Sequence, residues 1–301
     1  MPFDVVGFGE SSVDLMCVMP RHPAPGEKLR LTAVESQGGG QVATAMVACA
    51  RLGLTARYLG AVGDDDAGAR TLRELRAAGV DVAGVRVVAG AASRQAVVLV
   101  DAAGERTVLW HGDERTRLGP ADLDRERCCS GRVLHLDATM LAAAQAAAAW
   151  ARAAGILVSL DLDTPAPGVE ELIGLADLCV VPLAFACALT GAATAGAALR
   201  ALAGRCPGQV AVTLGQGGAL ALDGGAEVHE PAFAVDVVDT TGCGDVFHAA
   251  AIAARLRGLT PRPFLRFANA AAALATRRLG ARGACPTLAE VEALLATGVA
   301  R

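Results

Sequence analysis

The chain has 301 residues, with 27 lysines and arginines against 31 aspartates and glutamates and a formal net charge of −4. This length allows one large domain or two small ones, in either case with a sizeable core. Because acidic and basic residues are interspersed, the charge pattern excludes a polyelectrolyte surface, and we expect no nucleic-acid partner.

Short apolar runs alternate with alanine-rich stretches along the chain. In order, the runs are DVVGFG, RYLGAVG, VLHLD, ILVSLDLD, LCVVP and QVAVTLG, and each ends in glycine, an acid or proline. Strands that alternate with helices are typical of a mainly parallel sheet with helices on both faces. We therefore predict one α/β domain over residues 1–301, without an internal repeat or a long linker.

Two segments depart from this alternation. Residues 93–111 alternate apolar and polar side chains around the turn AAGE, which predicts a β-hairpin. Residues 15–36 contain three prolines and then the strand-like LRLTAVES. We predict that the two segments form a small sheet that projects from the main one and serves as a lid.

The most apolar stretch, residues 140–160, is interrupted by Gln145, Arg152 and Gly155. A membrane-spanning helix needs about 20 predominantly apolar residues, so we interpret this stretch as a buried helix followed by a strand and expect no membrane partner. The N-terminal sequence MPFDVVGFGE lacks the regions of a signal peptide, which leads us to expect a cytoplasmic protein.

Cysteine, histidine and lysine usage argues against several chemistries. The nine cysteines show no C-x-x-C spacing and the five histidines no pair at metal-ligand spacing, which indicates a reduced chain without a dedicated zinc site. Lys28 is the only lysine and follows Glu27. A Walker A loop and the strand lysine of protein kinases are therefore both absent, and Schiff-base chemistry is nearly excluded.

The segment VDTTGCGDVFHAA, residues 238–250, places two glycines directly before an apolar, helix-forming run. Gly242 and Gly244 allow successive backbone N–H groups to point outward, and the helix start adds the positive end of its dipole. Such a pocket suits a transferring phosphoryl group, and Asp245 is placed to accept the proton of an attacking hydroxyl. The alternative is structural: Thr240 or Thr241 caps a helix, and the glycines only form a turn.

A second cluster, the three glycines at positions 38–40, precedes another helical stretch. A glycine triplet permits close approach of a ligand but also occurs in loops that bind nothing. The preceding strand ends in SSVDL and places Asp14 at a carboxyl end, where open α/β sheets bind ligands. Asp14 is therefore a candidate substrate ligand.

In their order and spacing, these motifs resemble the ribokinase-like family of carbohydrate kinases, also called the phosphofructokinase B family. The resemblance runs nearly end to end, through GFGESSVDL, GGGQVATAMVACARLG with VGDDDAG, VTLGQGG, DTTGCGD and FANAAAALATRRLGARGACPTLAEV. Its specific part is DTTGCGD after VTLGQGG. The family implies a three-layer α/β/α sandwich with a small β lid at residues 15–36 and 93–111, and in relatives the lid can also form a dimer clasp.

The resemblance also implies roles for individual residues. Catalysis would rest on a base and an anion hole at Asp245, Gly242, Cys243 and Gly244. Sugar hydroxyls would be held by Asp14, Gly39, Gly40, Thr44 and Asp137. The nucleotide would lie near Thr213, Leu214, Gly215, Gln216, Gly217, Gly218 and Asn269. Asp239 falls where some members bind a monovalent cation such as K⁺, and ATP and Mg²⁺ are the implied cofactors.

Several of these positions have a structural alternative. Asp14 would cap the following turn, Asp137 would hydrogen-bond a neighbouring loop, and Asn269 would be a surface helix residue. Arg94 and Arg106, on the predicted lid hairpin, would either hold an anionic substrate group or lie on a solvated strand face.

Two positions depart from the family pattern. Thr44 replaces the usual asparagine, which leaves the sugar preference open. The Asn-x-x-Glu that precedes LTG in relatives is replaced here by Pro182 and Phe185, and neither side chain can bind a cation. By sequence order, Asp161 and Asp163 are the nearest acids for magnesium.

We predict an ATP-dependent kinase that phosphorylates a hydroxyl of a small sugar or sugar derivative, mainly by positioning and electrostatic stabilisation. One alternative is a nucleoside kinase, which would need aromatic residues to stack a base, and the lid offers Trp110 and His111. The other is a non-catalytic sugar-binding or regulatory protein, which would have no need for the base in DTTGCGD.

Overall fold

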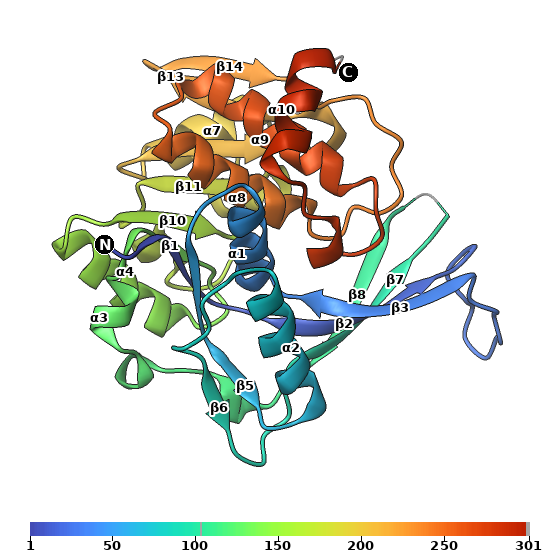
Figure 1. Ribbon diagram of the computed structural model, residues 1–301. Coiled ribbons are helices and arrows are strands. Elements are labelled where there is room, and N and C mark those ends of the chain that lie inside the picture. Colours follow the sequence, from blue (N-terminus) through green and yellow to red (C-terminus); the bar gives the residue numbers. More distant parts are fainter. Residues whose placement is uncertain (103, 299–301) are drawn as a thin grey trace.

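The computed structural model describes residues 1–102 and 104–298, and a large sheet forms its centre (Figure 1). Within these residues the sheet contains β1 (Phe3–Phe8), β4 (Ala56–Leu59), β9 (Gly131–Leu136), β10 (Leu157–Asp161), β11 (Leu178–Pro182), β12 (Gln209–Thr213), β13 (Ala219–Asp223) and β14 (Ala226–Glu230). Their spatial order is β14-β13-β12-β11-β10-β9-β1-β4. The strands from β12 to β4 pair in parallel, whereas β13 and β14 are antiparallel.

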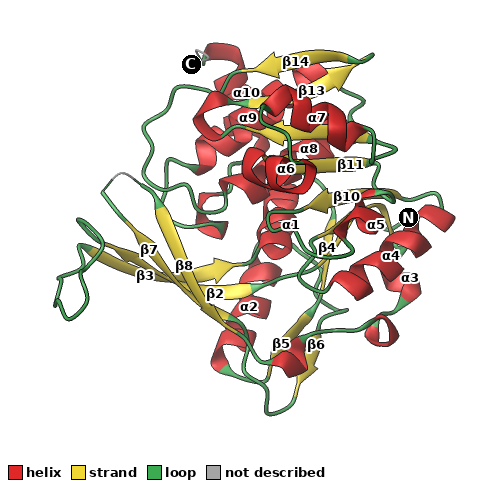
Figure 2. Ribbon diagram, turned by 180° about the vertical axis from the view of Figure 1, so that it is seen from behind, coloured by secondary structure: helices red, strands yellow, loops and turns green. Residues whose placement is uncertain are grey.

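Helices cover both faces of this sheet (Figures 1 and 2). One face carries α1 (Gln41–Arg51), α8 (Cys243–Leu256), α9 (Pro261–Ala275) and α10 (Leu288–Thr297). The other carries α3 (Arg125–Cys128), α4 (Leu141–Ala153), α5 (Val169–Ile173), α6 (Leu183–Thr190) and α7 (Ala195–Ala203). The three-layer α/β/α sandwich predicted from the sequence is therefore confirmed.

Consecutive residues of the central strands enter opposite cores, because side chains alternate between the two faces of a sheet. Val5 and Val133 belong to the core under α1 and α8, whereas Val6 and Leu134 belong to the core under α4. Strands buried on both faces are typical of parallel sheets. This burial explains why the strand segments are nearly continuous apolar runs instead of alternating ones.

The apolar stretch at residues 140–160 forms α4 and β10, as predicted. Alanine has the highest helix propensity, which favours a helix here. The buried residues of α4 are all alanines, so the side of the helix that faces the sheet carries only small side chains. Across the described residues, no single helix is long and apolar enough to cross a membrane; only α6 and α7 together meet that length and composition, and they are bent by 66° to each other.

A second sheet projects from the first (Figure 1). In the described part of the chain it consists of β2 (Ser12–Val18), β3 (Ala33–Gly39), β7 (Gln95–Val100) and β8 (Arg106–His111), in the order β3-β2-β7-β8. The hairpin predicted at 93–111 is β7 and β8, although Ala103 of its turn lies outside the described residues. The strand expected in LRLTAVES begins only at Ala33.

The remaining elements join the two sheets. The short strands β5 (Ala61–Gly63) and β6 (Arg86–Val88) pair in parallel, and α2 (Asp66–Ala77) lies between them in sequence and contacts β2, β3 and β5. Asp65 caps α2 by accepting a hydrogen bond from the Gly68 N–H, which satisfies one of the free donors at the helix start. Only three residues separate the end of β1 from the start of β2, so the projecting sheet is joined to the central sheet at the carboxyl end of β1.

Candidate active site

The segment DTTGCGD forms the entry to α8. Gly242 is the N-cap residue, with φ of 76° and ψ of −3°, and Asp245 lies in the first helical turn. The first N–H groups of an α-helix have no acceptor within the helix, and they carry the positive end of its dipole. The backbone of Gly242, Cys243 and Gly244 therefore has the geometry expected of an anion hole.

The two glycines of this segment are constrained differently. A Cβ atom on Gly242 would lie 2.6 Å from the Cβ and 2.7 Å from the Cα of Ala281, so only glycine fits there. A Cβ on Gly244 would meet no atom of the structure within 4 Å. The helix start is thus packed on the side of Gly242 and open on the side of Gly244, which leaves space for a ligand.

Asp245 lies in a strongly acidic environment. Burial raises the pKa of its carboxyl group well above the ordinary value, and the negative charge of Asp161 adds to this, whereas Arg106 opposes it. Glu10 and Asp163 raise the pKa further. A carboxylate with a raised pKa is a stronger base, which suits proton abstraction from a hydroxyl.

The tip of the projecting sheet contacts the same segment. Arg106 Nη1 lies 3.3 Å from Thr240 Oγ1 and 3.5 Å from the Thr240 carbonyl oxygen, and Thr240 Oγ1 lies 3.3 Å from the Gly104 carbonyl oxygen. The β7–β8 hairpin accordingly reaches the loop before α8 (Figure 1). Arg106 is exposed, but its guanidinium contacts Thr240 instead of lying free on a solvated strand face. No motif in the sequence indicated this contact.

Asp14 lies in β2, where its carboxyl group is buried and accepts a hydrogen bond of 2.6 Å from Ser12 Oγ. Burial raises the pKa of Asp14, and Ser12, Arg282 and Arg94 oppose this effect. Any side chain on Gly39 would overlap the Asp14 carboxylate, so Gly39 leaves that carboxylate its space.

Gly40 turns the chain from β3 into α1. Its φ of 89° is rare for other residues, and a Cβ there would lie 2.5 Å from Ser11 Cα. The structure therefore brings Asp14 of β2 next to Gly39 at the end of β3 and to Gly40, which follows it. Their contact with a sugar remains a prediction.

Two other predicted sugar ligands are enclosed by protein. Thr44 is completely buried, and its hydroxyl has no hydrogen-bond partner within residues 1–102 and 104–298. Asp137 accepts hydrogen bonds from the Glu10 N–H at 2.6 Å, the Thr139 N–H at 3.0 Å and Thr139 Oγ1 at 2.5 Å. Asp137 thus ties the ends of β1 and β9 together, which matches its structural alternative.

Sequence reasoning missed a charged pair next to this region. Glu10 follows β1 and pairs with Arg94, with Oε1 and Nε 2.8 Å apart, and the Arg94 guanidinium lies 3.7 Å above the centre of the Trp110 ring. Burial raises the pKa of Glu10 to about 7, and Arg94 opposes the shift. In the sequence, the one indication that Glu10 lies at the site is that it directly follows the first predicted strand.

The pair borders a cleft with a volume of about 60 Å³ that opens to solvent. Besides Glu10, its lining includes Ser11, Arg94, Trp110, Thr139 and Met140. The cleft lies beside the predicted acceptor site and not on Asp14 or Asp245. It therefore offers room for a substituent of the acceptor.

The predicted nucleotide loop follows β12. Its three-residue 3-10 helix, Gly215–Gly217, is exposed, and Gly218 has a φ of 88° and packs against the main chain at Glu230 and Pro231. Asn269 is buried in α9 and donates hydrogen bonds to the carbonyl oxygens of Glu230 at 2.9 Å and Pro231 at 3.2 Å. Asn269 thus supports the loop from behind and is not a surface residue.

The residues considered for cations differ in their accessibility. Asp239 is completely buried, and it accepts hydrogen bonds from the Thr241 N–H at 2.9 Å and the Gly280 N–H at 2.7 Å. Pro182 ends β11 and Phe185 is buried in α6, so neither offers a metal ligand. Asp161 faces inward toward His248, whereas Asp163 is exposed.

Known proteins are similar to this chain in sequence and in fold. The model of the pfkB family carbohydrate kinase matches residues 3–288. An ATP-dependent ribose-1-phosphate kinase of Halopiger xanaduensis is 34% identical over 97% of this chain and 97% of its own length. A crystal structure from Agrobacterium tumefaciens has a TM-score of 0.91 at 29% identity, covering 98% of both chains. The ribokinase of Arabidopsis thaliana complexed with ribose and ATP has a TM-score of 0.83 at 26% identity, covering 99% of this chain and all of its own.

Proposed function

Since this chain belongs to the pfkB family of carbohydrate kinases and is an ATP-dependent sugar kinase, we propose that its acceptor is a ribose-like pentose or a derivative substituted at the anomeric carbon. The observation that carries the proposal is the position of Asp245 at the open start of α8. The charge of Asp14 raises the pKa of Glu10, and the charge of Glu10 raises the pKa of Asp245, so the three carboxyl groups lie close enough for their charges to interact.

The chemistry we propose is direct transfer from ATP to a sugar hydroxyl. Asp245 accepts the hydroxyl proton as the oxygen attacks the γ-phosphorus, and ADP leaves. The N–H groups of Gly242, Cys243 and Gly244 stabilise the charge on the phosphoryl oxygens during transfer. Asp14 holds the sugar so that the attacking hydroxyl faces Asp245.

ATP would lie over the loop from Thr213 to Gly218, at its exposed part, where Gly215 and Gly217 have no side chains to obstruct it. Mg²⁺ would neutralise the triphosphate, and exposed Asp163 is better placed than inward-facing Asp161 to contact it or its waters. K⁺ would bind the carboxylate of Asp239, which already accepts hydrogen bonds from the N–H of Thr241 in the DTTGCGD loop and from the N–H of Gly280. Each assignment is part of the proposal.

The cleft beside the acceptor site favours a substituted pentose. Arg94 supplies a positive charge and Trp110 an aromatic face, which together suit a phosphate or a planar group at the anomeric position. The Halopiger relative is named for a sugar that carries such a phosphate. A nucleoside is the second candidate, because Trp110 lines the cleft, although Arg94 already covers its ring.

A substrate comparison tests this proposal. ADP formation would be measured with ribose, deoxyribose, ribose 1-phosphate, a ribonucleoside and two hexoses, glucose and fructose, each at fixed Mg-ATP. We expect at least one pentose or anomerically substituted pentose to give the highest kcat/KM. Hexoses that outperform every pentose would contradict the proposed acceptor class, although not the kinase activity.

We also propose a cytoplasmic homodimer that associates through the projecting sheet. Leu15, Val34 and Leu109 are large apolar residues exposed on one face of this sheet. Exposed apolar groups of this kind often mark an interaction surface. Light scattering on the purified protein measures the mass, and a monomer at micromolar concentration would contradict the proposal.

Asp14→Asn is expected to raise the KM for the sugar by about tenfold to a hundredfold, because hydrogen bonds that sugar hydroxyls donate to a charged carboxylate contribute about 1.5–3 kcal/mol. The KM for ATP should stay unchanged, since Asp14 faces the acceptor. Asp223→Asn, an exposed acid at the end of β13, is the matched control. Initial rates with each substrate varied in turn separate the two effects, and a selective loss of ATP affinity would overturn the assignment.

Arg106→Gln is expected to lower kcat by roughly tenfold, because it removes a charged contact between the hairpin tip and Thr240. Hydrogen exchange of the β7–β8 hairpin should increase, since the hairpin then opens more often. Arg30→Gln, an exposed arginine on the other lid segment, is the control. Unchanged exchange together with unchanged kcat would show that Arg106 does not hold the lid closed.

A further inference from the structure

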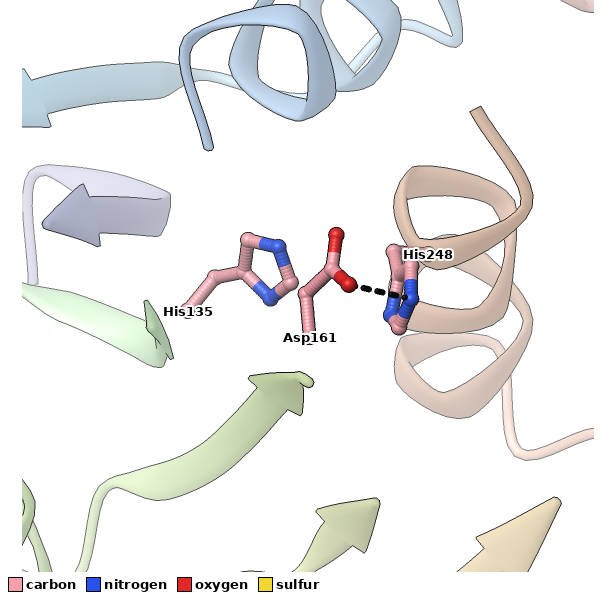
Figure 3. Close-up of side chains that lie close together, drawn as sticks. All are labelled: His135, Asp161 and His248. Atoms are coloured by element: carbon pink, nitrogen blue, oxygen red, sulfur yellow. Dashed lines mark ion pairs between the residues drawn. The ribbon is translucent and has the colours of Figure 1, made fainter. Parts of the chain in front are cut away.

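His135, Asp161 and His248 meet in the interior, between the sheet and α8 (Figure 3). They come from β9, the end of β10 and the second turn of α8, so 113 residues separate the two histidines in sequence although their ring centres are 5.6 Å apart. Their exposures are 0%, 5% and 4%. Histidines that are dispersed along the sequence therefore form a pair in the fold.

Each of the three side chains has one polar atom without a partner. Within the described ranges, Nε2 of His135, Oδ2 of Asp161 and Nδ1 of His248 have no hydrogen-bond partner. Buried polar atoms are almost always paired, with protein, water or an ion. Nε2 of His135 is therefore free to share a ligand with the neighbouring pair of His248 Nε2 and Asp161 Oδ1.

The surrounding structure orients His135 toward the acid. His135 and Ser159 are register partners in the parallel pair of β9 and β10, and His135 Nδ1 lies 3.1 Å from Ser159 Oγ. If Nδ1 donates its proton to Ser159, the lone pair of Nε2 is free to bind a cation. Metal-binding histidines typically have such a partner on their second nitrogen.

We propose that His135, Asp161 and His248 bind a divalent transition-metal ion, with Zn²⁺ as the best fit. Their ligand atoms all lie within 4.8 Å of one another, and His248 Nε2 is 3.1 Å from Asp161 Oδ1. Tetrahedral Zn²⁺ with ligand distances of about 2.0–2.1 Å places its ligand atoms about 3.4 Å apart. The ion replaces the proton that His248 otherwise shares with Asp161, and a water completes the four ligands.

The ligand chemistry separates this site from the cations of phosphoryl transfer. Two imidazoles and one carboxylate suit Zn²⁺ and related transition metals, whereas Mg²⁺ prefers oxygen ligands. The site also lies inside the protein, while the anion hole is at the open start of α8. His248 follows Asp245 by three residues on α8, so the ion would lie one helical turn below the proposed base.

Metal content of the purified chain tests the proposal without reference to activity. The protein is stripped with a chelator, equilibrated with Zn²⁺, passed through a desalting column and analysed for metal. The native chain should retain about one equivalent, with a higher melting temperature than the stripped protein. Asp161→Asn and His248→Gln should each weaken Zn²⁺ affinity at least tenfold, whereas His229→Gln, on exposed β14, should not.

Co²⁺ in place of Zn²⁺ distinguishes this site from the nine cysteines. Nitrogen and oxygen ligands give visible bands of tetrahedral Co²⁺ without the intense near-ultraviolet absorption of a thiolate–metal bond. Circular dichroism verifies that the variants are folded. Three results would each overturn the proposal: no retained metal, equal retention by native protein and Asp161→Asn, or a thiolate spectrum.

Discussion

Asp245→Asn is expected to lower kcat by a factor of about 10² to 10⁴, because it removes the proposed general base without changing the shape of the side chain. ATP affinity should change little, since Asp245 acts on the acceptor hydroxyl. Asp236→Asn, an exposed acid in the loop before α8, is the matched control and should keep native kcat. A variant at position 245 with most of its kcat would exclude Asp245 as the base.

The same substitution has a pH-dependent effect on stability. Burial raises the pKa of Asp245 in the folded chain, so the unfolded chain releases this proton at a lower pH than the folded one does. The stability of the native protein therefore falls as pH rises above the ordinary range of an aspartate. Asparagine cannot ionise, so the melting temperature of the variant should exceed the native value by a margin that grows with pH.

Ionisation of Asp245 lowers the stability of the native enzyme, but it should raise kcat. Activity needs the ionised carboxylate, so it should decline on acidification at a pH above the ordinary range of an aspartate. A pH–rate profile measured beside the melting curves checks both effects. An acidic limb at the ordinary pKa of an aspartate would contradict the raised pKa of Asp245.

Gly242→Ala is expected to reduce kcat at least a hundredfold, because the new methyl group overlaps Ala281 and displaces the N–H groups of the anion hole. Loss of one preorganised donor alone costs about 10²–10³ in kcat. The positive φ of 76° adds strain of about 1–3 kcal/mol, which lowers the melting temperature.

Gly258→Ala separates strain from pocket damage. Gly258 follows the other end of α8 with a φ of 71°, and a Cβ there would meet no atom within 4 Å. This control should be destabilised by backbone strain but keep native kcat. If both variants retained kcat, the N–H groups at the start of α8 would not stabilise the transferred group.

The sequence was sufficient for the main features of the fold because they depend on local patterns. Apolar runs that end in glycine or an acid indicated the strands, and DTTGCGD indicated the glycine-rich helix start at Gly242. The late start of β3 at Ala33 was not predicted, since residues 28–32 have the composition of a strand but lie outside the paired register.

Contacts between distant residues could not be predicted in this way. Arg106 reaches Thr240, and Glu10 pairs with Arg94, only because the projecting sheet is attached beside β1. The pairing of His248 with Asp161 depends on the order of strands in the central sheet and on the position of α8 above it. Neither property is encoded in a short stretch of sequence.

Some positions were predicted as ligand-binding sites, but their partners within the protein were not predicted. Asp137 and Asn269 both follow family positions, yet the structure engages them with Thr139 and with the carbonyl of Glu230. A carboxylate or amide at the end of an element can serve a ligand or a neighbouring loop equally well. Only the three-dimensional arrangement distinguishes the two uses.

Product identification with the native chain and Asp245→Asn in parallel tests the central claim most directly. Each protein is incubated with Mg-ATP and a pentose acceptor, and phosphorus NMR follows the fate of the γ-phosphoryl group. We expect equal amounts of ADP and a sugar phosphate ester for the native chain, no ADP without sugar, and little of either product for the variant. ADP with inorganic phosphate in place of an ester, or equal ester formation by both proteins, would contradict it.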